Sequence, residues 1–232
     1  MKQISLFFAA LVIGFAALAG NTDKTETRNV SNFKGVDVSA GIDLYITMGE
    51  TESVKIVADD DIIDRIITEV NDGVLRIYVK QNNWFNWTGN ETRKAYVTIK
   101  ELNKIEASSG SDVQSENTLK GEELKIRVSS GADVNVDVYY KDLDVDTSSG
   151  SDAKLTGKVK NLKANSSSGS DINAGDLESV VCNANASSGS DVTVNVSGEL
   201  RATASSGADV NYYGNPSVKD IDESSGGDVS RK

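Results

Sequence analysis

Histidine is absent from the 232 residues, and cysteine occurs once. Without histidine the chain cannot build a Ser-His-Asp or Cys-His nucleophile system, and it cannot hold zinc through imidazole. The single cysteine, Cys182, cannot form a disulfide within the chain, so packing and hydrogen bonds must hold the fold. Any catalysis would therefore depend on carboxylates, lysine, tyrosine or the backbone.

Aromatic residues and positive charge are also scarce. Aromatic residues make up 6% of the chain and hydrophobic residues 38%, which favours a thin core lined by small aliphatic side chains over a wide globular core. The formal net charge of −11 argues against nucleic acid as a partner, because phosphate binding needs clustered Lys and Arg. It also argues against simple adsorption to anionic lipid.

The first residues predict export. A positive start at Met1 and Lys2 precedes an apolar run over residues 4–18, and Ala17-Leu18-Ala19 has the small-x-small pattern of a cleavage site. We interpret residues 1–20 as a signal peptide. The run is shorter than the roughly 20 residues that span a bilayer, and no later run is long enough, so we expect no transmembrane segment. The mature chain, residues 21–232, is expected in the periplasm, at the cell surface or in the medium.

The remaining chain is dominated by one repeat. The string SSG(S/A/G)D occurs seven times, and its glycines are separated by 21, 19, 19, 20, 18 and 19 residues: Gly110, Gly131, Gly150, Gly169, Gly189, Gly207 and Gly226. A diverged eighth copy lies upstream at residues 39–43. Self-similarity at a fixed short period is typical of solenoids.

Around each copy, apolar residues alternate with polar ones, as in a strand with one buried face. The positions at odd offsets from Gly169 are Leu162, Ala164, Ser166, Ile172 and Ala174. By this alternation Cys182 also points inward and is interpreted as a small core residue. The first Ser, the Gly and the Asp of each copy are expected to point outward.

A unit of about 19 residues cannot bury its own apolar side, but stacked units form a continuous narrow core. We therefore predict an all-β parallel β-helix, in which each turn of the solenoid, or rung, is one repeat. The repeat rungs occupy residues 103–232 of a single domain. Residues 21–102 are expected to cap the rod, with strands at 42–48, 53–58, 74–80 and 95–100 and a short helix at 60–70. The polar residues at 219–223 mark the other end.

The same order of segments resembles a bacterial family. Residues 33–50 (FKGVDVSAGIDLYITMGE), residues 72–80 (DGVLRIYVK), the SSGSD rungs and residues 212–218 (YYGNPSV) are similar to the head GIN domain of putative auto-transporter adhesins, which are frequent in Bacteroidetes. The Gly-Ile-Asn element of that family stands here as Gly41-Ile42-Asp43. The resemblance implies a right-handed parallel β-helix at the cell envelope, and it brings no catalytic residues.

One outward-pointing aspartate in each rung is the first candidate for binding. Three interpretations are open: hydrogen bonds to backbone N–H groups of the same or the next rung, a calcium-binding face, or a surface for a glycan or a protein. The motif lacks the paired glycines of the nonapeptide calcium repeat. The aspartates are Asp112, Asp133, Asp152, Asp171, Asp191, Asp209 and Asp228.

The second candidate is the aromatic segment Trp84, Phe85 and Trp87, which contains both tryptophans of the chain. Exposed aromatic side chains beside asparagines can stack on sugars or on a partner protein, and the same cluster can instead plug the end of a core.

These features predict a non-enzymatic envelope or surface protein, an adhesin or a binding scaffold, whose partner is a glycan or a cell-surface protein. No cofactor is expected, with calcium as the one alternative. A polysaccharide-acting lyase or hydrolase is the second hypothesis, since β-helices also host such enzymes.

Overall fold

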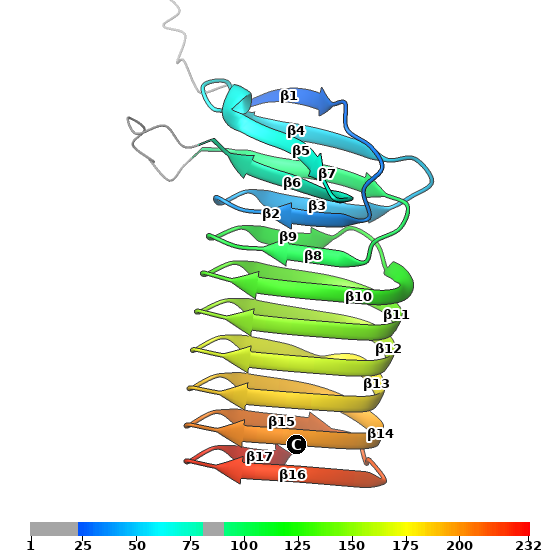
Figure 1. Cartoon of the computed structure of the whole chain (residues 1–232), viewed down its shortest axis with the longest axis vertical. Helices are drawn as coiled ribbons and strands as arrows, with labels where there is room; N and C mark the ends of the chain where they lie inside the picture. Colours follow the sequence, from blue (N-terminus) through cyan, green and yellow to red (C-terminus); the bar gives the residue numbers. More distant parts are fainter. Residues whose placement is uncertain (1–22, 81–90) are drawn as a thin grey trace, which may run out of the picture.

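The computed structural model describes residues 23–80 and 91–232, and the predicted signal peptide lies outside them. The described chain forms a rod of stacked strands that lie across its long axis (Figure 1). The repeat rungs are built from β8 (Lys104–Ala107), β9 (Asp112–Ser115), β10 (Leu119–Ser129), β11 (Asp133–Ser148), β12 (Asp152–Ser167), β13 (Asp171–Ser187), β14 (Asp191–Ser205), β15 (Asp209–Tyr213), β16 (Val218–Ser224) and β17 (Asp228–Arg231). Successive rungs pair in parallel, which confirms the predicted β-solenoid with rungs of about 19 residues.

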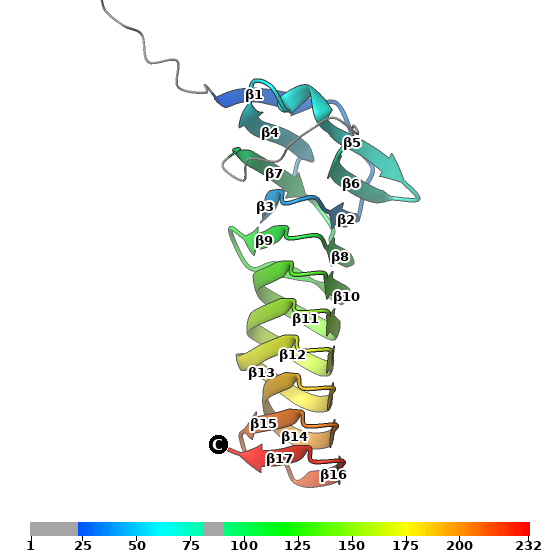
Figure 2. The ribbon, with the colours of Figure 1, turned by 90° about the vertical axis from the view of Figure 1, so that its left-hand side faces the viewer.

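Each rung is flattened, with two faces joined by a corner at one edge and a bend at the other (Figure 1 and Figure 2). The long strands run through the bend, since the first residues of β11 pair with β9 while the residues from Val138 onward pair with β10. The corner is the SSG motif. We call the two edges the corner edge and the bend edge.

Two consecutive residues with positive φ make each corner. At Ser149 and Gly150 the φ angles are 60° and 67°, the combination found at the centre of type I′ turns. Ala40 and Gly41 repeat it with 68° and 66°, so the diverged copy is a true corner. The corners are also bonded to one another, because the N–H of Gly150 donates to the carbonyl of Ser168 in the next rung at 3.3 Å.

The predicted alternation is confirmed along the repeat. Leu162, Ala164, Ile172 and Ala174 are buried, and so is Cys182. The fourth motif residue is buried in the first six copies. In three of them a serine hydroxyl accepts the N–H of the first motif serine, as Ser151 does from Ser148 at 3.1 Å. The core is therefore a thin double layer of small aliphatic side chains with a line of serines beside the corner.

The amino-terminal segment begins the stack and closes it. Its elements are β1 (Asp23–Arg28), β2 (Gly35–Val38), β3 (Asp43–Met48), β4 (Ser53–Asp59), the 3₁₀ turn η1 (Ile63–Arg65), β5 (Ile66–Asn71), β6 (Val74–Val79) and β7 (Arg93–Ile99). β2 and β3 form a rung on which β8 and β9 stack in parallel, and β6 and β7 stack in parallel on its other side. Antiparallel pairs, β5 with β6 and β4 with both β7 and β1, then cover that end (Figure 2).

The predicted helix at residues 60–70 is wrong. Only the three-residue turn η1 is helical there, and the chain continues as strand β5. The hairpin turn at Asp72 and Gly73, with φ of 49° and 73°, directs β5 back along β6. The backbone groups of β5 are therefore bonded to a neighbouring strand, which a helix would not allow.

The last rung differs from the others at its inward positions. Leu200, Ala204 and Tyr212 are buried, and the residues in register with them are Lys219, Glu223 and Arg231. Charged side chains thus occupy positions that are apolar one rung earlier. The strands of this rung pair with β14 and β15 on one side only.

Candidate functional site

The predicted aspartates form one continuous line along the rod. Each pairs with its equivalent in the neighbouring rung, and the line extends to Asp43, which pairs with Asp112. We call the line the aspartate column: Asp43, Asp112, Asp133, Asp152, Asp171, Asp191, Asp209 and Asp228. Each aspartate begins the strand after a corner. It points outward because the residues on either side of it are buried, or partly buried in the case of Asp228.

Backbone groups of the next rung contribute to holding these carboxylates. Oδ1 of Asp171 accepts the N–H of Asp191 at 3.1 Å. This is the first of the three interpretations of the column. Partial burial raises the pKa of the Asp152 carboxyl, and repulsion from Asp171 and Asp133 adds to the rise. The same causes, with Asp171 and Asp209 as neighbours, raise the pKa of Asp191.

A metal centre would need several carboxylates around one point. Within residues 23–80 and 91–232, no group of three or more His, Cys, Asp or Glu side chains is arranged to hold a metal ion. The column instead places one carboxylate in each rung. The calcium interpretation stays a prediction. The second candidate of the sequence analysis, the aromatic residues Trp84, Phe85 and Trp87, lies outside the described residues.

A cluster of charged side chains on one flat face of the rod bears on the enzyme hypothesis. Nε of Arg127 lies 2.8 Å from Oδ2 of Asp146, and Nη2 lies 3.2 Å from Oδ2 of Asp144. The remaining oxygens face Lys163, at 3.7 Å from Asp144, and the amide of Asn165, which donates to Asp146. Three of the four carboxylate oxygens thus have an Arg127 or Asn165 partner, whereas Oδ1 of Asp144 is buried, accepts no hydrogen bond from the described residues and has only the Lys163 ammonium nearby.

The cysteine has no reactive surroundings. Cys182 is buried in the core, and burial raises the pKa of its thiol to about 12. A thiol with so high a pKa is protonated at neutral pH and is a poor nucleophile. This confirms the interpretation of Cys182 as a core residue.

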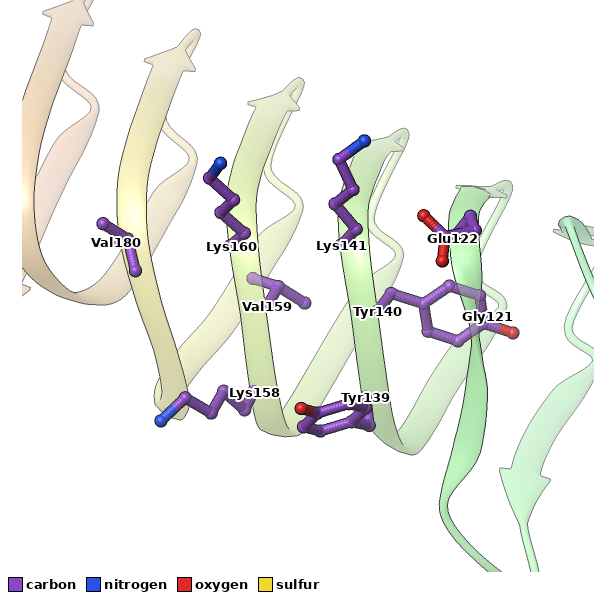
Figure 3. Close-up of a pocket in the computed structure, with 9 residues that line it drawn as sticks. All are labelled: Gly121, Glu122, Tyr139, Tyr140, Lys141, Lys158, Val159, Lys160 and Val180. Atoms are coloured by element: carbon purple, nitrogen blue, oxygen red, sulfur yellow. The ribbon is translucent and has the colours of Figure 1, made fainter.

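The bend edge carries a surface that sequence reasoning missed. Tyr139, Lys141, Lys158 and Lys160 line a pocket of about 300 Å³ there, between β10 and β13 (Figure 3). The signal was present in the sequence as a cluster of lysines next to the pair Tyr139-Tyr140, within an acidic chain. These residues do recur with the period of the rung, since Lys120, Tyr139 and Lys158 are 19 residues apart, as are Lys141 and Lys160, but they occupy only two or three rungs and do not stand out beside the seven copies of the SSG motif.

Crystal structures of similar proteins share this architecture. A putative adhesin from Bacteroides fragilis NCTC 9343 superposes with a TM-score of 0.86 at 22% identity, covering 92% of this chain and 98% of that chain. A putative adhesin from Parabacteroides merdae ATCC 43184 gives a TM-score of 0.75 at 19% identity over 90% of this chain and 96% of its own.

A protein from Parabacteroides distasonis ATCC 8503, described as a putative lipid binding protein, gives a TM-score of 0.66 at 20% identity, covering 92% of this chain and 98% of that chain. At these identities the likeness concerns the fold alone. No curated protein matches the sequence.

The sequence itself decides the family. The profile described as "Putative auto-transporter adhesin, head GIN domain" matches residues 32–216, from just before β2 to just before β16. The match includes the first rung, the closing strands other than β1, and the repeat rungs as far as β15. The chain therefore belongs to the putative auto-transporter adhesin, head GIN domain family.

Proposed function

We propose that this chain is exported and acts without catalysis as a binding protein of the cell envelope, an adhesin or a scaffold. The observation that carries the proposal is the in-register repetition of outward polar side chains, one set per rung, along the whole rod. Each contact to such a surface is weak, but a polymer or a second surface meets many equal contacts at once, which raises the overall affinity. Membership of an adhesin family supports the same conclusion.

Two further observations support a role without catalysis. The charged side chains on the flat face, among them Arg127 and Asp144, are paired with one another, and the aspartate column spreads its carboxylates along the rod. In the part of the chain that the structure describes, no helix is long and apolar enough to cross a membrane.

The test uses residues 21–232, purified and applied to immobilised neutral and acidic polysaccharides and to whole cells. We expect retention of the protein without release of reducing ends or unsaturated sugars. Release of such products would show the polysaccharide-acting enzyme instead. A protein that is retained on none of these surfaces would contradict the proposal.

The aromatic segment stays a prediction from the sequence. Replacing Trp84, Phe85 and Trp87 together by Ser should reduce binding and leave the circular dichroism spectrum and melting temperature nearly unchanged if these side chains recognise a ligand. Tyr213→Ser, at an exposed aromatic on β15, is the matched control. Unfolding of the triple variant would show that the cluster is a core plug.

A further inference from the structure

The pocket at the bend edge combines an exposed aromatic ring with lysines from neighbouring rungs. Tyr139 pairs with Lys120 of β10 and with Lys158 of β12, so these three side chains form one row. Lys141 and Lys160, which follow the paired residues Tyr140 and Val159, form a second row on the other side of the bend (Figure 3). We call these five residues the lysine edge.

The floor between the two rows is fixed. Tyr140 is buried and its hydroxyl donates to the carbonyl of Leu102 at 2.8 Å. Its ring lies under Gly121, where a Cβ atom would come within 2.5 Å of Tyr140 Cε1. Val159 continues the floor in the next rung and is also buried. The pocket therefore has a rigid apolar base with charged side chains on both sides.

The lysine edge is positive in a chain with a net charge of −11. Within the described part of the chain, Lys120 and Lys160 make no ion pair, and Lys141 lies 4.0 Å from Asp142. Lys158 pairs with Glu178 at 3.1 Å, but both side chains are mostly exposed, so the pair contributes little and can be exchanged for a ligand. Glu122 limits the positive surface on the β10 side.

Tyr139 determines what kind of anion fits. It is 60% exposed, and it shares the pocket with three lysines and with one exposed aliphatic side chain, Val180 of β13, so the exposed part of the pocket is mixed rather than purely apolar. An exposed aromatic ring offers an apolar face and a polar hydroxyl, which together suit the C–H face and the hydroxyls of a sugar ring. Lysines spaced by one rung suit negative groups repeated along a chain.

We infer that the lysine edge binds an acidic saccharide, with a sugar ring stacked on Tyr139 and its carboxylate or sulfate held by Lys158 and Lys160. This inference rests on the proposed function and names the class of ligand for it. Because the site lies at one position along the rod, it would give the repetitive faces a specific point of attachment. The pocket volume of about 300 Å³ is at the lower end of the range for small-molecule sites, which suits a short segment of a polymer.

The test measures binding of three oligosaccharides of equal length to residues 21–232 by calorimetry at low and high salt. A galacturonate oligomer carries carboxylates, a sulfated galactan oligomer carries sulfates, and an unmodified galactan oligomer is neutral. We expect the protein to bind one or both acidic oligomers at least tenfold more tightly than the neutral one, and to lose affinity as salt increases. The two acidic probes distinguish carboxylate from sulfate as the recognised group.

Two variants and two matched controls locate the site. Lys158→Gln with Lys160→Gln, and separately Tyr139→Ser, should each lower the affinity at least tenfold with an unchanged melting temperature, because these side chains are exposed. Lys125→Gln with Lys154→Gln removes the same charge from the flat faces, and Tyr213→Ser removes another exposed ring. Both controls should bind within twofold of the parent protein.

The outcomes separate this inference from the proposed function. Equal binding of neutral and acidic oligomers, or equal affinity in the lysine-edge variants and the parent, would overturn the inference while retention on cells still supports adhesion. Binding of an acidic protein but of neither acidic oligomer would also overturn it and identify a protein partner. A parent protein that binds no probe and no surface would overturn both.

Discussion

The glycines of this chain differ in what a side chain would meet. At Gly169, in a corner, φ is +66° and a Cβ atom would meet no atom of the described chain within 4 Å, so only the backbone conformation opposes a side chain. At Gly157, in β12, φ is +106° and a Cβ would overlap the carbonyl oxygen of Val138 in the neighbouring rung. Glycine is thus needed at Gly169 for conformation and at Gly157 for space as well.

Alanine at these two sites should therefore have unequal effects. We expect Gly169→Ala to lower the free energy of unfolding by about 1–2 kcal/mol, the strain of a left-handed residue. Gly157→Ala should lower it by roughly 3 kcal/mol or more, because steric overlap adds to the strain. Chemical denaturation of both variants measures the difference, and equal losses would contradict the assignment.

The aspartate column makes a prediction about pH. The pKa values of Asp152 and Asp191 are raised in the folded state, by partial burial first and by neighbouring aspartates second. A carboxyl with a raised folded pKa binds more protons when folded, so its contribution to stability falls as the pH rises through that pKa. At neutral pH the unfavourable effect of the two charges is fully present.

Asp152→Asn with Asp191→Asn should therefore be more stable than the parent near pH 7. The advantage should shrink as the pH falls through the raised pKa toward the ordinary aspartate value of about 3.9. Denaturation at several pH values measures it, with Asp176→Asn as the control outside the column. If the double variant is less stable at neutral pH, the carboxylates are stabilising; a rise in the parent's melting temperature with added calcium would then identify a bound cation.

At the scale of the strand, the last rung shows how the open end of the stack is protected. An unpaired strand edge can pair with another chain, and inward-pointing charges are one way to prevent it. Lys219 and Glu223 hold such positions, and Glu223 also accepts the N–H of Val229 at 2.8 Å. The ammonium of Lys219 lies 6.0 Å from the centre of the Tyr212 ring, which keeps the charge over the end of the core.

Replacing these two residues by those of the preceding rung should expose an adhesive end. We expect Lys219→Leu with Glu223→Ala to associate through β16 as the concentration rises, since an apolar edge of that rung would then be open. Sedimentation velocity would detect the larger species. Asp222→Thr, which changes an outward position of the same strand to its equivalent Thr203, should stay at the parent's size.

The strands were predictable to different degrees. The strands of the repeat rungs could be predicted from the alternation of apolar and polar residues, because residues such as Leu162 and Ala164 alternate with polar neighbours and a glycine marks every corner. The segment at residues 60–70 did not, since Ile62, Ile63 and Ile66 suit one face of a helix as well as the buried side of a turn and a strand. Only the pairing of β5 with β6, a tertiary contact, decides between them.

The two candidate sites also differed in how far the sequence could predict them. The aspartate column was visible because an aspartate recurs in every copy of the motif, and its register is set by the corner. The lysine edge was not, because the bend falls inside long strands such as β11 and β12 and no glycine or proline pattern marks it. Which lysines share a surface with Tyr139 depends on where each strand turns, and that is a property of the packed rungs.

For the whole molecule, regular stacking predicts tolerance to an added rung. Residues 152–170 contain β12 and the following corner, and they pair with equivalent residues on both sides. A tandem duplication of these residues should fold, lengthen the rod by about 4.8 Å and leave the melting temperature no lower. Small-angle scattering and thermal melts measure both effects.

A duplication of half a rung, residues 161–170, is the control. It inserts a segment of one face where the other face is needed, so the chain can no longer follow the register of β11. We expect it to lower the melting temperature clearly. A similar effect of the two insertions would contradict the independence of the rungs.

The direction of the hydrogen bonds also determines how the rod responds to force. The strands lie across the long axis and the bonds between rungs run along it, with β1 at one end and β17 at the other (Figure 1). Tension between the two ends therefore pulls along these bonds, which can break one after another, so that the rungs separate one at a time. Each released rung of 19 residues extends by roughly 65 Å. A protein held between two surfaces would lengthen in such steps, and the rungs still folded would keep their binding faces under load.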